Sequence, residues 1–188
     1  IKLFDNEQLI KLSHVDIESV AEFRVKDFVP RGSTALLDAI GDTLKYFMEK
    51  KLMNPTAYDN CMVYIATDGL ENTSHKYNRE YIKKMIKSAR ETYNINVLYL
   101  GANQDAILEA NNIGIHADQA INYSETQENV EAVYRSAAAV ATRSRTNGGF
   151  DGFIQAERVA SQQQYQPEED ENIPVPPSVV RQLAYANQ

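Results

Sequence analysis

The chain has 188 residues, of which 43% are apolar and 24% charged, the composition of a globular domain large enough to bury its own core. Its formal net charge of −7 argues against a protein that binds nucleic acid by neutralising phosphates. No apolar run approaches the roughly 18 residues of a membrane span. The single cysteine, Cys61, excludes an intrachain disulfide and favours a reducing compartment, and its apolar neighbours predict a buried, inert thiol.

The N-terminal part of the chain predicts a hairpin and then a long helix. Residues 1–4 and 8–12 are apolar runs around a polar turn, and residues 16–23 predict a short helical turn. Proline, glycine and the hydroxyl residues Ser33 and Thr34 then suit the start and cap of a helix. The apolar face of that helix repeats at three- and four-residue steps: Leu36, Leu37, Ile40, Leu44, Phe47 and Met48.

Strands and helices alternate through the middle of the chain. Continuous apolar runs at residues 61–66 and 95–101 are typical of strands in a parallel sheet covered on both faces. Further elements are expected as helices at 78–93 and 106–112, a strand at 120–123, and a helix beginning near a Ser124/Thr126 cap. This alternation predicts an α/β fold in three layers, with a doubly wound, mostly parallel sheet.

The character of the chain changes at about Ser144. Two glycines, a glutamine run, the acidic run Glu168-Glu169-Asp170-Glu171 and several prolines follow, and this part carries more than half of the net charge. Short helices are expected at 150–164 and 178–186. The sequence therefore predicts a domain over 1–143 and a linker or tail over 144–188 that is partly helical, acidic and proline-rich.

Sequence signatures of catalysis are absent. The chain has no glycine-rich phosphate loop ending in Lys-Ser/Thr, no nucleophilic serine between glycines and no paired-histidine zinc helix. The histidines, His14, His75 and His116, are scattered and are expected at the surface or satisfied by neighbours. Nothing in the sequence points to an enzyme.

Two loops are expected at the edge of the sheet where the parallel strands end, the usual place for ligands. One contains Thr34, and the other contains Asp68 directly after the strand at 61–66. A hydroxyl and a carboxylate brought together are hard oxygen ligands of the kind that Mg²⁺ prefers. From spacing alone, the structural alternative is favoured, in which Ser33 and Thr34 cap a helix and Asp68-Gly69 forms a turn.

Three segments resemble the von Willebrand factor type A (vWA) family over residues 1–143: LFDNE at 3–7, PRGSTALLDAIG at 30–41 and IATDGLENTS at 65–74. LGAN at 100–103 fits the same pattern. The resemblance implies a Rossmann-like sheet and often a metal-ion-dependent adhesion site (MIDAS). It implies that Thr34 and Asp68 are Mg²⁺ ligands, Asp68 through a water, and that a partner protein's carboxylate completes the metal shell. This is recognition rather than catalysis.

The sequence also departs from the family, because the Asp-x-Ser-x-Ser motif that ends the family's central strand is missing. The resemblance therefore leads us to expect an N-terminal segment of several tens of residues upstream, or alternatively a strand donated by another chain. Unpaired, buried strand edges would otherwise cost about 1–3 kcal/mol for each orphaned polar group. Thr34 and Asp68 alone are too few ligands for useful Mg²⁺ affinity.

Two functions are compatible with these observations. The first is a non-catalytic protein-binding module, Mg²⁺-dependent if the missing loop is present, in which Ser33, Arg31 and Glu71 contact the partner. The second is a structural or assembly component of a multi-subunit particle such as a virion, whose tail docks onto a neighbouring subunit. The tail residues expected to dock are Pro176 and Pro177 in an extended segment and Leu183 as an apolar anchor. A solubilising, disordered tail is the alternative, and an intracellular or virion location is favoured over secretion.

Overall fold

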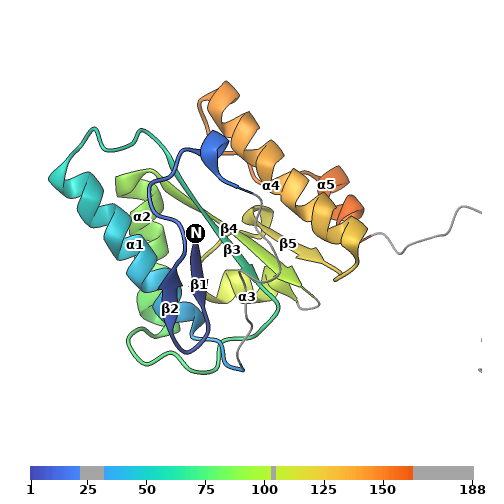
Figure 1. The fold of residues 1–188 in the computed structure, drawn as a ribbon, viewed down its shortest axis with the longest axis horizontal. Helices are drawn as coiled ribbons and strands as arrows, with labels where there is room; N and C mark the ends of the chain where they lie inside the picture. Colours follow the sequence, from blue (N-terminus) through green and yellow to red (C-terminus); the bar gives the residue numbers. More distant parts are fainter. Residues whose placement is uncertain (22–31, 103–104, 163–188) are drawn as a thin grey trace, which may run out of the picture.

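The structure is a computed structural model that describes residues 1–21, 32–102 and 105–162. It is a mixed α/β fold in which helices flank three parallel strands (Figure 1). These strands are β3 (Cys61–Thr67), β4 (Ile95–Ala102) and β5 (Ala120–Tyr123), adjacent in that order. Helices α2 (Arg79–Tyr93) and α3 (Ala106–Asn112) connect them. The predicted α/β class with parallel strands is confirmed at this level.

Two layers of helices enclose the sheet. On one face, α1 (Leu36–Met53), α2 and α3 share an apolar core with alternate residues of the strands, among them Ile65, Val97 and Tyr99. On the other face, α4 (Gln127–Asn147) packs against Leu98, Leu100 and Ile121. Because neighbouring residues of a strand point to opposite faces, one strand supplies both cores. No helix in the described ranges is long and apolar enough to cross a membrane.

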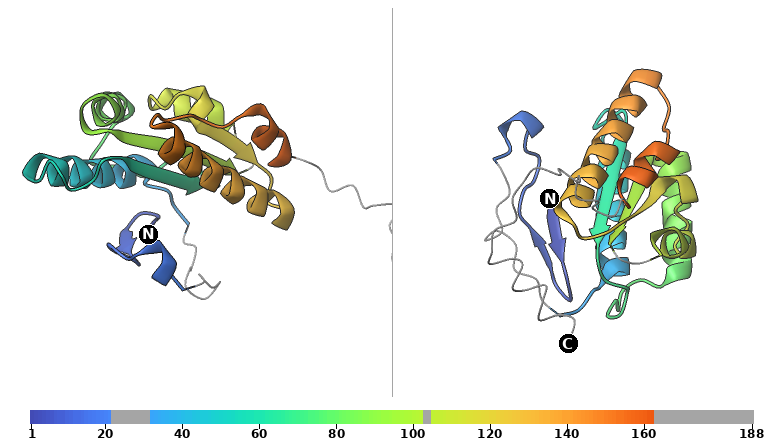
Figure 2. Two further views of the ribbon diagram at one scale, coloured as in Figure 1. Left: turned by 90° about the horizontal axis from the view of Figure 1, so that it is seen from above. Right: turned by 90° about the vertical axis from the view of Figure 1, so that its right-hand side faces the viewer.

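The N-terminal hairpin forms its own two-stranded sheet. Strands β1 (Lys2–Phe4) and β2 (Gln8–Ile10) pair antiparallel, as the sequence predicts, and both views of Figure 2 show them apart from the three-stranded sheet. The 3-10 turn η1 (Ile17–Ser19) follows, within the predicted turn at 16–23, of which the last two residues lie outside the described ranges. The hairpin is joined to α1 by a hydrogen bond from the Gln8 amide to the Asp42 carboxylate, at 2.9 Å.

Strand β3 has a partner on only one side within the described part of the chain, because it pairs with β4 alone. The Cys61 amide donates to the Asn94 carbonyl on the β4 side, at 3.1 Å. Backbone polar groups alternate along a strand, so those of Met62, Tyr64 and Ala66 point away from β4. Tyr64 is also 42% exposed. The prediction that residues 61–66 are covered on both faces is therefore wrong, whereas every residue of β4 is buried, as predicted for 95–101.

The segment after α4 packs back onto the fold. Helix α4 continues to Asn147, beyond the domain boundary predicted at 143. Gly148, in the left-handed conformation (φ 69°), caps its C-terminus. Phe153 is buried in the α4 core, and α5 (Gln155–Ala160) is joined to α4 by the ion pair between Arg143 and Glu157. The expected helix at 150–164 is thus present in shorter form, and that at 178–186 lies outside the described ranges. The boundary itself stays a prediction.

Candidate functional site

Thr34 and the loop after β3 lie together at the edge where the parallel strands end. The Thr34 amide donates to the Asn72 side-chain carbonyl at 2.9 Å, and the Asn72 amide donates to the Thr34 carbonyl at 3.1 Å. A Cβ atom on Gly69 would lie 2.7 Å from the Thr34 hydroxyl oxygen, so a larger residue there would force the Thr34 side chain to shift. The structure therefore places Thr34 against the residue that follows Asp68.

Asp68 is exposed at the end of β3. Its charge acts on Tyr123, the last residue of β5, whose pKa is raised to about 12. Burial of the phenol is the main cause, and the nearby Tyr134, Asp68 and Glu125 add to it. This edge of the sheet therefore presents an accessible carboxylate close to a phenol that stays protonated at neutral pH.

The start of α1 is capped by distant residues rather than by its own neighbours. Its N-cap residue is Ala35, with no side-chain cap hydrogen bond, so the cap predicted at Ser33 and Thr34 is wrong. Instead, the Leu37 amide donates to the Glu71 carboxylate at 2.9 Å, and the Asp38 amide donates to the Ser74 hydroxyl at 3.1 Å. Four amides at a helix start have no partner within the helix, and these two are satisfied across the fold.

Glu71, predicted as a partner contact, is half-buried and accepts hydrogen bonds from within its own loop as well. The amides of Thr73 and Ser74 donate to it at 3.0 and 2.7 Å, and the Ser74 hydroxyl at 2.7 Å. Together with the Leu37 amide, these donors tie the loop to α1. A contact of Glu71 with a partner stays a prediction, and the structure assigns this carboxylate an internal role that the sequence did not suggest.

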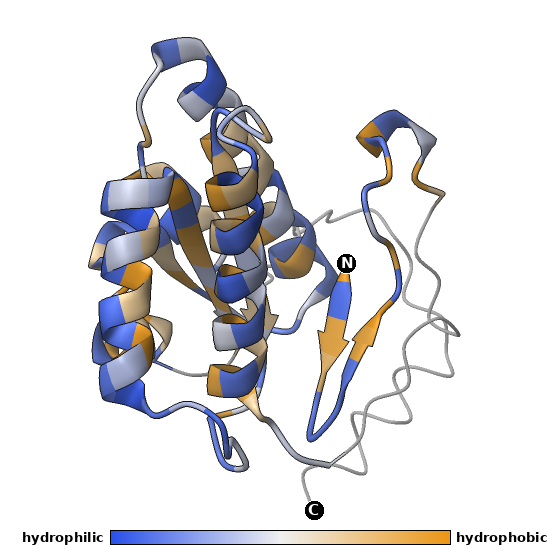
Figure 3. Cartoon of the chain, turned by 90° about the vertical axis from the view of Figure 1, so that its left-hand side faces the viewer, coloured by the Kyte–Doolittle hydropathy of each residue, from blue (hydrophilic) through white to orange (hydrophobic). Residues whose placement is uncertain are grey.

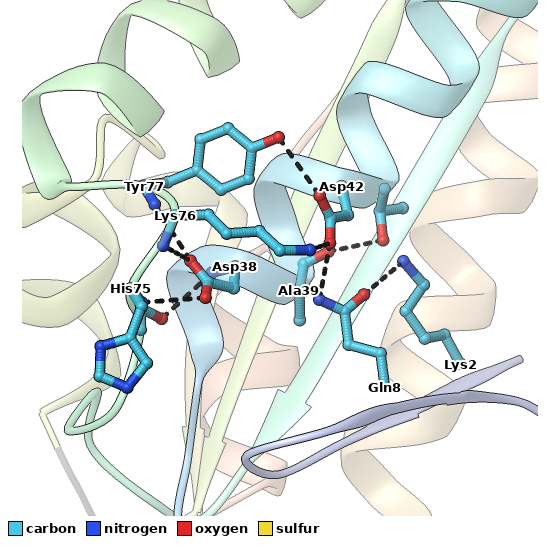
Figure 4. Close-up of polar contacts among 10 residues, drawn as sticks. Lys2, Gln8, Asp38, Ala39, Asp42, His75, Lys76 and Tyr77 are labelled. Carbon is cyan, nitrogen blue, oxygen red and sulfur yellow. Dashed lines mark hydrogen bonds and ion pairs between the residues drawn. The ribbon is translucent and has the colours of Figure 1, made fainter.

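Asp38 is the second carboxylate that holds this loop, and sequence reasoning missed it. It is 7% exposed and accepts from three consecutive amides, those of His75, Lys76 and Tyr77, at 2.9–3.0 Å (Figure 4). The Tyr77 ring lies so close to α1 that a Cβ on Gly41 would clash with it. An acidic residue in the first turn of a helix was the available signal, because it suits the positive end of the helix dipole.

One turn further along α1, Asp42 joins the hairpin to the same loop. It accepts from the Lys76 ammonium at 2.8 Å, the Gln8 amide at 2.9 Å and the Tyr77 hydroxyl at 3.2 Å (Figure 4). Burial by itself would raise the pKa of Asp42, but these donors, Lys76 foremost, outweigh it and lower the pKa below its usual value. Asp42 therefore stays ionised and connects three segments.

The described residues do not by themselves fit a magnesium ion. Mg²⁺ requires near-octahedral oxygen coordination and is held by at least one or two carboxylates with waters or other ligands. Within the described ranges, no cluster of three or more histidine, cysteine, aspartate or glutamate side chains could hold a metal. Thr34 and Asp68 supply one hydroxyl and one carboxylate. Of the other predicted contacts, Ser33 is half-buried beside Thr34, and Arg31, Pro176, Pro177 and Leu183 lie outside the described residues.

No protein family model, curated protein sequence or solved structure matches the chain. We therefore infer function from the geometry of the edge that carries Thr34 and Asp68.

Proposed function

We propose that the chain is a non-catalytic protein-binding module of the vWA type. Its binding surface is the edge of the sheet formed by Thr34, Asp68 and the loop that follows β3. The observation that carries the proposal is the close contact between Thr34 and Gly69, the residue that follows the exposed Asp68. Both residues belong to segments that resemble the vWA family, and the parallel strands end at this edge.

The rigidity of the edge supports binding. Asp38 and Glu71 accept hydrogen bonds from backbone amides at both the start of α1 and the loop after β3. A loop already fixed in one conformation loses little entropy when a partner binds. Asp68 stands on this fixed loop with its side chain in solvent. The edge is thus a pre-organised surface with an accessible acid, Asp68, which suits a partner that brings a cation or a hydrogen-bond donor.

In this proposal, magnesium binds only when further oxygen ligands are supplied. When oxygen atoms from outside the described residues join Thr34 and Asp68, the metal would bind at this edge and accept a carboxylate from the partner. With Thr34 and Asp68 alone, binding at the edge is expected to be independent of magnesium.

A second candidate function is that of a structural or assembly component. The observation that favours it is the apolar surface of the N-terminal segment, where the hairpin strands are largely orange in Figure 3. Ile1, Leu9, Ile10 and Ile17 are 49–85% exposed. Exposed apolar side chains grouped in one segment commonly mark a contact surface. In this alternative the edge is a scaffold, and the hairpin and the segment 165–188 dock onto neighbouring subunits.

Affinity capture from an extract of the source cells separates the two functions. The bait is the full chain as wild type, Thr34→Ala or Asp68→Ala, each with Mg²⁺ or with a chelator. Asp59→Ala is a matched control, because Asp59 is exposed just before β3 whereas Asp68 follows its end. We expect one set of proteins to be lost, at least fivefold, with both edge variants and kept with the control. Capture that is indifferent to these variants and to chelator, but is lost when residues 165–188 are deleted, would replace the first function by the second.

A further inference from the structure

A groove lies on the other side of the fold from the candidate site. It has a volume of about 470 Å³ and runs between α2 and the connection from α3 to β5. One wall is a stripe of α2 at helical spacing, Lys83, Lys84, Lys87 and Arg90, and the other is the backbone at 114–116. These residues precede the starts of β4 and β5, whereas Thr34 and Asp68 lie where strands end. The groove is therefore separate from the proposed binding edge.

The groove is strongly basic in a chain that is acidic overall. Four cations line it against one carboxylate, Glu80, although the chain carries a net charge of −7. Within the described residues, Lys83, Lys84 and Lys87 form no ion pair, unlike Lys76 with Asp42 or Arg143 with Glu157. Like charges along one helix face repel one another, so these lysines favour an anion that would lie among them.

Arg90 adds a directed donor to this charge. One of its terminal nitrogens, Nη1, is buried without a hydrogen-bond partner, and the other lies 3.7 Å from Glu91. A buried donor without a partner is unfavourable, and an anionic acceptor in the groove would supply that partner. The opposite wall comes close because Gly114 adopts a left-handed conformation (φ 88°), and a Cβ there would lie 2.8 Å from the Lys83 side chain.

We propose that this groove binds an acidic peptide segment, and that the segment is the run Glu168-Glu169-Asp170-Glu171 of this chain. The stripe from Lys83 to Arg90 spans seven residues, or about 10 Å along a helix. Four consecutive acids in an extended chain span about the same distance. Carboxylates matched to the lysines and to Arg90 would neutralise the groove with charge-assisted hydrogen bonds.

The connection to the run starts from α5, which contacts the segment next to the groove wall. The Arg158 guanidinium, on α5, donates to the Ala117 carbonyl at 2.8 Å, and Ala117 directly follows His116 in the groove wall. At the end of α5, the Ser161 hydroxyl donates to the Asn122 carbonyl of β5 at 2.8 Å. Glu168 is the seventh residue after Ser161, and seven steps of extended chain reach about 23 Å.

A labelled peptide tests the proposal in the full chain. The probe is a synthetic peptide with the sequence of residues 164–173, and its binding is followed by fluorescence anisotropy in low salt. In the fourfold variant Glu168→Gln, Glu169→Gln, Asp170→Asn, Glu171→Gln, the acidic run of the chain is neutral and no longer competes, and we expect tight binding. In the wild-type chain, the resident run competes, and we expect an apparent affinity at least tenfold weaker.

Two further variants locate the binding. Lys84→Glu with Lys87→Glu, both exposed on α2, added to the fourfold variant should weaken peptide binding at least tenfold. Lys11→Glu with Lys45→Glu, both exposed elsewhere, change the net charge equally and should leave binding within twofold. Circular dichroism confirms that each variant is folded. Failure of the peptide to bind the fourfold variant, or equal losses with both lysine pairs, would overturn the groove as the site.

The same experiment identifies the source of the acidic segment. Equal affinity in the wild-type chain and the fourfold variant would overturn the assignment to Glu168–Glu171, since no resident segment would then compete. Sedimentation of the wild-type chain is expected to show a monomer. A dimer that the fourfold variant abolishes would overturn binding within one chain in favour of exchange between two copies.

Discussion

Strands β4 and β3 are surrounded by different stabilising interactions. Around β4, apolar side chains from both helical layers leave every residue of the strand buried. Around β3, α1 and the hairpin, carboxylates connect the segments. Asp38 and Glu71 accept hydrogen bonds from backbone amides. Asp42 accepts hydrogen bonds from Lys76, Gln8 and Tyr77. The two strands have similar apolar sequences, so their neighbours rather than their own residues decide how deeply each is buried.

The largest difference is expected from matched truncations in the two strands. Leu98→Ala, at a fully buried position of β4, should lower the free energy of unfolding by about 3–5 kcal/mol through lost burial and a cavity. Met62→Ala, in half-buried β3, should lower it by about 1 kcal/mol, because solvent already reaches this side chain. Urea denaturation followed by circular dichroism measures both. Losses of equal size would show that β3 is as well enclosed as β4.

Removing a buried carboxylate should have the next largest effect. Asp38→Ala leaves three amides without their acceptor, and we expect a loss of about 2–3 kcal/mol in the free energy of unfolding. The exposed Asp59→Ala is the control and should stay within about 0.5 kcal/mol of wild type. A small loss for Asp38→Ala would mean that polar contacts contribute little on the β3 side.

A pH dependence follows from Asp42. Its pKa is lower in the folded chain than in the unfolded chain, so its stabilising contribution is complete above about pH 5 and is lost as the pH falls through the folded pKa. Asp42→Asn should reduce the free energy of unfolding by less than about 1 kcal/mol at pH 7, since the side chain is partly exposed. Urea denaturation from pH 7 to 3 should show this difference shrinking below about pH 4. A difference that grows on acidification would contradict the direction of the shift.

The smallest effect concerns the thiol at the start of β3. Burial raises the pKa of Cys61 to about 11, so the thiol is almost entirely protonated at pH 8. Because the thiolate is the reactive form, labelling by a disulfide reagent should be slow at pH 8 and should accelerate up to about pH 11. The urea-unfolded chain is the control and should level off near pH 9. A native rate that levels off at the same pH would show that β3 does not shield the thiol.

Local patterns predicted the elements that depend on nearby residues. Helix α3 and strand β5 begin and end where the sequence predicts, and Thr126 caps α4 by accepting from the Asn129 amide at 3.2 Å. Local patterns could not predict the cap of α1, because the capping side chains are distant in sequence. Glu71 and Ser74 lie 34 and 36 residues from the helix amides whose hydrogen bonds they accept. The open side of β3 was missed for a similar reason: an apolar run does not tell which neighbours will cover it.

The carboxylates of Asp38 on α1 and of Glu71 in the loop after β3 also determine where the chain should accept foreign sequence. Residues 68–78 form neither helix nor strand. The carboxylates of Asp38 and Glu71 nevertheless accept hydrogen bonds from five backbone amides and one hydroxyl of this loop, and from one amide at the start of α1. A tag or reporter inserted between residues 71 and 77 would break these hydrogen bonds together. The exposed turn at 54–56, between α1 and β3, is the better place for a graft. A loop without regular secondary structure is here one of the less replaceable parts of the protein.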